Sequence, residues 1–235
     1  MTERRSEQPA KSAAKRVMGA VALEVVDRRG ALRQLLTALR ERSGRTFAFC
    51  NMHTFNVALQ SPAVVAALAQ ATVFNDGVGI DIASRILFGE PFPDNLNGTD
   101  LTAQLLALLD RPTSLFLIGS APGIAEQAGE QLERKFPQVK TVGAHHGFFT
   151  PDEGDQLVDR IRDAKPDLVL LGMGNPRQEL WAAEIRGRTD ALIMCVGAYL
   201  DYASGSIRRA PRFIRSLRIE WLYRLVSEPI RLSRR

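Results

Sequence analysis

The sequence predicts an α/β fold, with a mostly parallel sheet that helices cover on both faces. Short runs of nearly continuous apolar residues occupy 114–120, 139–144, 167–174 and 191–198, and stretches with helical apolar spacing separate them. Strands that are apolar on both sides are typical of parallel sheets buried between two helical layers. Hydrophobic residues make up 45% and charged residues 24% of the chain, which is ordinary for a globular protein with a sizeable core.

The remaining elements are predicted from the same kinds of pattern. The apolar run at 46–51 predicts a buried strand, and Ser61-Pro62 is a typical N-cap and first residue of a helix. Asn75-Asp76-Gly77 is a turn-forming triplet. We expect Thr99 or Asp100 to cap the helix that follows. The expected helices span 30–42, 61–71, 81–89, 100–109, 122–136, 151–164 and 176–188.

Three segments differ in character. Residues 1–20 start with MTERRSEQPAKSAAKR, which is polar and predicts a disordered leader. Residues 21–204 form the α/β domain. Residues 205–235 mix arginine with aromatic and aliphatic residues at helical spacing, which predicts a basic, amphipathic appendage.

The positive charge is concentrated in that appendage. It holds nine Arg and two Glu, a charge of +7, whereas the whole chain carries +5, so residues 1–204 carry −2. A solvated helical face does not need the interleaved Phe213, Trp221 and Tyr223, and a negative main body argues against an extended nucleic-acid surface. An anionic membrane suits both the arginines and the apolar groups.

Other features exclude several classes of protein. Cys50 and Cys195 lie in apolar runs, and the three His have no metal-ligand spacing, so we expect buried thiols and no metal site. No apolar stretch approaches the ~18 residues that span a bilayer, and no signal-peptide core is visible. We therefore expect a cytoplasmic protein, peripheral to the inner face of the plasma membrane.

Glycine and polar residues follow nearly every predicted strand. In open α/β sheets, ligands bind beyond the carboxyl ends of the strands, where backbone N–H groups meet anions. The glycine loops suit a diphosphate, and tight turns are an equally good explanation for any single loop. The candidate loops span 51–56, 75–79, 119–123, 172–179 and 197–201.

Several side chains in these loops are candidates for chemistry. Asp76 can accept a proton from an attacking hydroxyl, and an Asx-turn or helix cap is the alternative. Thr54 and Asn56 can donate to diphosphate oxygens or cap a helix. Gln178 and Glu179 lie in the first turn of a predicted helix, where Glu179 suits the helix dipole whatever the function.

Taken together, these motifs resemble the WecG/TagA/CpsF glycosyltransferases, bacterial enzymes of cell-wall and surface-polysaccharide assembly. The resemblance covers nearly everything after residue 20, and the order and spacing of DG-x-G, G-x-P-x-Q-E and RAP…EWLYRL…EP-x-R are specific. The matching stretches are 54–56, 75–80, 97–101, 116–120, 147–149, 172–181, 197–211 and 219–235.

The resemblance implies a Rossmann-like body and a C-terminal appendage that reaches the membrane and helps to complete the active site. It implies inverting transfer of a hexose or N-acetylhexosamine from a UDP-sugar, commonly UDP-N-acetylmannosamine. The acceptor is a sugar on undecaprenyl diphosphate, and neither a cofactor nor a divalent metal is expected. We also expect that the chain can self-associate and that it does not bind nucleic acid.

The resemblance also assigns site residues. Asp76 falls on the family's proposed base, Thr54 and Asn56 fall on donor contacts, and Gln178 falls on an active-site glutamine. The other expected substrate contacts are Gly77, Asn97, Gly119, Arg209, Arg212, Arg224 and Arg231. Asp94-Asn95 departs from the pattern, because many members carry Glu-Arg there. Either another Arg supplies that cation or the enzyme uses a different sugar, such as glucose.

Two other classes of function remain as alternatives. A nucleotide-binding oxidoreductase on the same fold needs a dinucleotide fingerprint and a ribose-binding acid after the first strand, and neither is visible. A membrane-recruited scaffold without activity is the other. Protection by UDP but not by NAD, or measured sugar transfer, separates the three.

Overall fold

The computed structural model describes residues 14–207, and within them the main sheet has six strands, all parallel. Their order across the sheet is β4-β3-β8-β7-β5-β6. The predicted fold class is confirmed, while the predicted appendage at 205–235 lies almost entirely outside the described residues. The strands are β3 (Thr46–Cys50), β4 (Thr72–Asn75), β5 (Thr113–Gly119), β6 (Val139–His145), β7 (Leu168–Gly172) and β8 (Leu192–Cys195).

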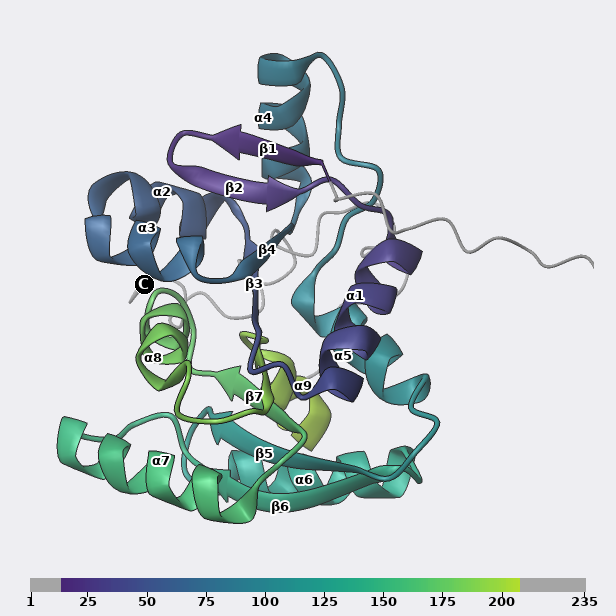
Figure 1. Cartoon of the computed structure of the whole chain (residues 1–235), viewed down its shortest axis with the longest axis vertical. Helices are drawn as coiled ribbons and strands as arrows, with labels where there is room; N and C mark the ends of the chain where they lie inside the picture. The colour runs from purple at the N-terminus through teal and green to yellow at the C-terminus, as the bar shows by residue number, and fades with distance from the viewer. Residues whose placement is uncertain (1–13, 208–235) are drawn as a thin grey trace, which may run out of the picture.

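Helices cover both faces of this sheet, and each layer buries its own apolar cluster. Residues of α1, α5, α6 and α9 pack on one face, and residues of α3, α7 and α8 pack on the other. Figure 1 shows α1 and α5 on one side of β3 and α3 and α8 on the other. The helices are α1 (Arg28–Glu41), α2 (Met52–Gln60), α3 (Pro62–Ala69), α4 (Val78–Phe88), α5 (Gly98–Ala107), α6 (Ile124–Lys135), α7 (Pro151–Ala164), α8 (Arg177–Ile185) and α9 (Tyr199–Ser204).

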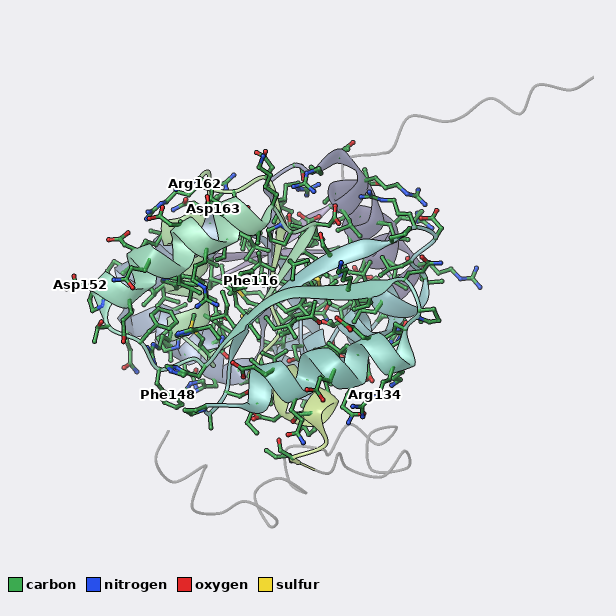
Figure 2. All side chains as sticks on the ribbon, turned by 90° about the horizontal axis from the view of Figure 1, so that it is seen from below. Phe116, Arg134, Phe148, Asp152, Arg162 and Asp163 are labelled. Atoms are coloured by element: carbon green, nitrogen blue, oxygen red, sulfur yellow. The ribbon has the colours of Figure 1, made fainter. Side chains whose placement is uncertain are left out.

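The strands at the centre of the sheet are almost entirely apolar, and helices cover both of their faces. Every residue of β3, β7 and β8 is buried, and Phe116 of β5 is 1% exposed. Figure 2 shows α7, with Asp152 and Arg162, and α6, with Arg134, on opposite sides of β5 and β6. Alternating helices and buried strands thus fix a sheet whose carboxyl ends share one edge.

The N-terminus differs from the prediction of a leader that reaches residue 20. Strands β1 (Lys15–Met18) and β2 (Val21–Glu24) form an antiparallel hairpin, so the prediction is wrong for residues 15–18. Met18, Val21 and Leu23 are buried in the same cluster as α3 and α8, and this apolar contact holds the hairpin on the body. Residues 1–13 lie outside the described part of the chain.

Other helix boundaries in the structure also differ from the predicted ones. Helix α5 begins at Gly98, because the Asn97 side chain accepts from the Asp100 N–H at 2.8 Å, so the expected cap at Thr99 or Asp100 is wrong. Helix α2 was not predicted. It buries Thr54 and exposes Leu59, which reverses the usual pattern, and the Asn51 side chain caps it. Helix α4 starts at Val78, three residues earlier than expected.

Among residues 14–207, no helix combines the length and the apolar character that a membrane crossing requires.

Candidate active site

A cavity of about 400 Å³ opens at the carboxyl ends of β5, β7 and β8. Backbone forms much of its wall, because four of the lining residues are glycines. It is lined by Ser120, Ala121, Gly147, Phe148, Gly172, Met173, Gly174, Arg177, Gly197, Ala198 and Asp201. Its position is the one at which parallel α/β sheets bind ligands.

Glycine is required here because the strand ends approach each other closely. A Cβ on Gly119 would lie 2.5 Å from the backbone of Gly172, and a Cβ on Gly172 would lie 2.8 Å from the carbonyl oxygen of Gly197. Gly119, predicted to contact substrate, thus allows the carboxyl ends of β5 and β7 to approach each other closely. Its neighbour Ser120 is the residue that lines the cavity.

Polar groups of different kinds reach this cavity. The Ser120 hydroxyl is buried and has no hydrogen-bond partner within residues 14–207. Arg177 is exposed, and its guanidinium lies 5.9 Å from the centre of the Phe148 ring and 5.3 Å from that of Phe149. Asp201, from α9, brings a buried carboxyl. The cavity therefore offers a hydroxyl, a cation, an exposed ring and one acid.

A second cavity of about 370 Å³ lies between α5, α6 and α9. It is lined by Thr99, Ala103, Gln131, Leu132, Arg134, Lys135, Tyr199, Tyr202, Ala203 and Ile207. None of these was a candidate site residue, and seven of them belong to α6 and α9. We therefore take the cavity at the strand ends as the candidate active site.

Asp76 stands at the carboxyl end of β4, on the same edge as the glycine-lined cavity. It is half-buried, and its N–H donates to the carbonyl oxygen of Cys50 at 2.9 Å, which ties it to the neighbouring strand β3. Burial, together with the negative charges of Asp76 and Glu179, raises the pKa of the Cys50 thiol to about 12. Asp76 and Glu179 are thus both close enough to the Cys50 thiol to raise its pKa electrostatically.

The loop around Asp76 is held from both sides. The Gly77 N–H donates to the Asn95 side chain at 2.7 Å, so this predicted substrate contact is occupied by Asn95. Asn75, which is fully buried, donates to the Asp94 carbonyl at 2.8 Å and to the Asp81 carboxylate at 3.4 Å. These contacts place the two residues that depart from the family pattern directly beside Asp76.

An arginine contacts Asp94 and Asn95, the two residues that depart from the family pattern. The Arg28 guanidinium donates to the Asn95 carbonyl at 2.9 Å, and the Arg28 N–H donates to the Asp94 carboxylate at 2.9 Å. Arg28 begins α1, far from Asn95 in the sequence, so sequence spacing gave no signal for this contact.

Other predicted contacts serve helix ends in this structure. Thr54 is 1% exposed, and both its N–H and its hydroxyl donate to the Asn51 side chain. Asn97 caps α5. Asn56, by contrast, is exposed on α2. The predicted roles of these three residues in substrate binding stay predictions.

Gln178 is buried and holds two loops of the cavity together. Its Oε1 accepts from the Gly174 N–H at 3.2 Å and from the Gly197 N–H at 3.1 Å, and its Nε2 donates to Glu179 at 2.8 Å. Both glycines line the cavity. The predicted active-site glutamine is therefore beneath the cavity wall, where it fixes the loops after β7 and β8.

Glu179, predicted to lie in a first helical turn where it suits the helix dipole, is buried within the first turn of α8. It is 3% exposed, and its Oε1 accepts from Asn175 as well as from Gln178. Burial raises the pKa of its carboxyl, although these hydrogen bonds oppose the rise. From sequence alone, a Glu in the first turn of a helix is usually interpreted as a surface residue. Only the packing of α8 in the structure shows that Glu179 is buried.

The two cysteines are buried and free, as predicted. Burial, and the nearby Glu179, raise the pKa of the Cys195 thiol well above its ordinary value. Thiols in this state are protonated and poor nucleophiles. Between residues 14 and 207, no group of three or more His, Cys, Asp or Glu lies close enough to hold a metal ion. Arg209, Arg212, Arg224 and Arg231 fall outside the described residues.

The fold is that of an α/β protein with a glycine-lined cavity at the carboxyl edge of a parallel sheet. Residues 16–235 match the model of one protein family, described as the glycosyl transferase WecG/TagA/CpsF family. The match covers most of the chain, and the protein belongs to this family. It is therefore a glycosyltransferase of surface-polysaccharide and cell-wall assembly, as the motifs predicted.

Proposed function

We propose that this protein is an inverting glycosyltransferase that moves a hexose or N-acetylhexosamine from a UDP-sugar to a sugar on a polyprenyl diphosphate. One observation supports this proposal above the others. A half-buried carboxylate, Asp76, lies at the same sheet edge as a glycine-lined cavity that suits a nucleotide. A single base beside a bound donor is what inversion by one displacement requires.

The cavity at β5, β7 and β8 holds the UDP. Its glycine backbone can approach phosphate oxygens closely, and Arg177 and the Ser120 hydroxyl, which has no partner within residues 14–207, are donors for the same anion. The exposed ring of Phe148 is a platform on which a base can stack. The Asp201 carboxylate repels phosphate and accepts from hydroxyls, so it suits the ribose.

Asp76 acts on the acceptor. Its carboxylate takes the proton of the attacking hydroxyl, whose oxygen then forms a bond to the anomeric carbon of the donor. The bond from that carbon to the β-phosphate oxygen breaks, and UDP leaves with the electron pair. General bases of this kind contribute roughly 10²–10⁴ in rate.

The charge that grows on the β-phosphate needs donors that are already in place. Within the described residues, the glycine loops, Ser120 and Arg177 can supply them. Arg209, Arg212, Arg224 and Arg231 are the further donors that the family pattern assigns, and they would arrive with the appendage. We propose that no metal takes part.

A lipid-linked acceptor suits the other side of Asp76. Residues 51–75, which form α2, α3 and the strand that ends beside Asp76, contain no Asp, Glu, Lys or Arg. Helix α4 starts two residues after Asp76 and exposes Ile82, Ile86 and Leu87, with Ile86 77% exposed. An apolar, acid-free surface beside the base suits a polyprenyl chain and an anionic bilayer.

A panel of UDP-sugars with polyprenyl-diphosphate-linked sugars tests the proposal. With purified full-length protein, one pair should give a product whose new glycosidic bond has the anomeric configuration opposite to the donor's, as measured by NMR coupling constants. A product with retained configuration contradicts the single displacement. Thermal stabilisation by NAD and not by UDP would favour the oxidoreductase alternative instead.

A further inference from the structure

Glu179 is a buried carboxyl for which the proposed reaction has no use. Its side chain joins two residues of the β7–α8 segment, because Oε1 accepts from the side-chain amides of both Asn175 and Gln178. The other oxygen, Oε2, is buried and has no partner within the described residues. A buried polar group with an unsatisfied oxygen is costly to fold around, so its presence calls for a compensating role.

The contacts continue from Glu179 to the cavity wall. Gln178 can accept from the Gly174 and Gly197 N–H groups only while its oxygen faces them and its NH₂ faces away. The NH₂ then needs an acceptor, and Glu179 Oε1 is that acceptor. The orientation of the Gln178 amide therefore depends on Glu179.

The two glycines are positions at which the loop conformation is unusual. Gly174 has a φ of 79° and Gly197 a φ of 58°, both in the left-handed region, and both line the cavity. Their N–H groups point at Gln178 beneath the wall. Since each loop is anchored from below by one shared oxygen, a rotated Gln178 amide would release both at once.

We propose that Glu179 is a positioning residue for the nucleotide-sugar cavity: as a hydrogen-bond acceptor, it orients Gln178 and Asn175 and so holds the loops after β7 and β8 in their binding shape. This inference rests on the proposed function for the identity of the ligand, UDP, and not for the loop geometry. Glu179 does not exchange a proton with substrate in this account.

The acceptor role of Glu179 rests on the geometry of its hydrogen bonds. Burial raises the pKa of this carboxyl, and its hydrogen bonds to Gln178 and Asn175 oppose the rise. With or without a proton on Oε2, Oε1 can accept from both side-chain amides.

Substitution of Glu179 by the isosteric amide distinguishes a role as a hydrogen-bond acceptor from a role as an acid. Glu179→Gln keeps an oxygen at the position of Oε1, so we expect the UDP Kd, the donor KM and kcat to stay within about threefold of the wild type. Glu179→Met fills the same space without an acceptor. We expect it to raise the UDP Kd and the donor KM about tenfold or more, with a smaller change in kcat.

Amide hydrogen exchange gives a readout that does not depend on activity. In Glu179→Met the Gly174 and Gly197 N–H groups should exchange faster than in the wild type, while amides in the centres of β5 and β7 keep their protection. In Glu179→Gln both glycine amides should stay protected. Asn175→Ala, at a half-buried loop position, should speed exchange at Gly174 and leave Gly197 unchanged, and it remains informative if Glu179→Met does not fold.

Three results overturn the proposal. The first is a loss of UDP affinity in Glu179→Gln as strong as in Glu179→Met, which would assign the carboxyl an acid or base role. The second is a Glu179→Met protein with both glycine amides protected and an unchanged UDP Kd. The third is unchanged exchange at Gly174 in Asn175→Ala. If the wild type itself does not bind UDP, the proposed function fails, whereas the exchange data still decide whether Glu179 holds the loops.

Discussion

The carboxyl edge of the sheet has two halves that differ in chemistry. At β5, β7 and β8 the edge is glycine backbone, a hydroxyl, an arginine and an acid around a cavity of about 400 Å³. At β3 and β4 it carries one half-buried carboxylate, Asp76, between helices that are almost free of charge. The first half is built to hold an anion rigidly, and the second offers a base beside an apolar surface.

This difference indicates that one half of the edge binds the donor and the other half receives the acceptor. A nucleotide diphosphate needs many fixed donors, which the closely packed strand ends provide. A lipid-linked sugar needs a proton acceptor and a surface that tolerates hydrocarbon. Changes at one half should therefore affect donor binding, and changes at the other should affect turnover or the acceptor.

The largest expected effect comes from removing the base. Asp76→Asn should lower kcat by roughly 10²–10⁴, while the Kd for UDP stays within about threefold, because the amide keeps the shape and loses the proton acceptor. Initial rates and calorimetry measure the two quantities. Asp100→Asn, at the start of α5, is the matched control and should keep its turnover. A tenfold weaker UDP affinity in Asp76→Asn would place this residue in the donor half instead.

The second effect is on stability. Gly119→Ala places a Cβ 2.5 Å from the Gly172 backbone at a φ of 150°, and we expect a loss of about 2–4 kcal/mol in the free energy of unfolding. Gly187→Ala is the control, because its φ is 81° but nothing lies within 4 Å of the new methyl group, so about 1 kcal/mol is expected. Urea denaturation compares them, and equal losses would show that close packing of β5 and β7 is unimportant.

The third effect is on donor affinity alone. Phe148 is 65% exposed, so Phe148→Ala should leave the free energy of unfolding nearly unchanged. Loss of base stacking should raise the UDP Kd about tenfold, from a stacking contribution of ~1–3 kcal/mol. Calorimetry with UDP and with pyrophosphate is the measurement. A similar loss for pyrophosphate, which has no base, contradicts the stacking role.

The smallest effect is expected on the acceptor side. Ile82→Ser combined with Ile86→Ser removes exposed apolar groups from α4, the helix that begins two residues after the base, and we expect a roughly fivefold higher KM for a long-chain acceptor. The KM for an acceptor with a short, soluble chain should not change. Equal effects on both acceptors would mean that α4 does not contact the lipid.

Much of the fold could be predicted because buried parallel strands have a simple signature. The helix expected at 151–164 is α7 to the residue, and each predicted apolar run became a strand. The hairpin at β1 and β2 could not be predicted in the same way, because its alternating residues follow a polar segment and gain their stability from contact with distant helices.

The site was predictable in part. Strand-end loops located Asp76 and the glycines, since carboxyl ends of parallel strands meet at one edge. The buried roles of Gln178 and Glu179, and the Arg28 contact with Asn95, depend on tertiary packing between segments far apart in the sequence. A first-turn Glu gives the same local pattern whether it faces solvent or the core.

A crystal structure of the full-length protein with UDP tests the central claim most directly. We expect UDP in the cavity at β5, β7 and β8, with its ring on Phe148 and its β-phosphate directed toward Asp76. UDP in the cavity between α5, α6 and α9, or a β-phosphate that points away from β4, would contradict it.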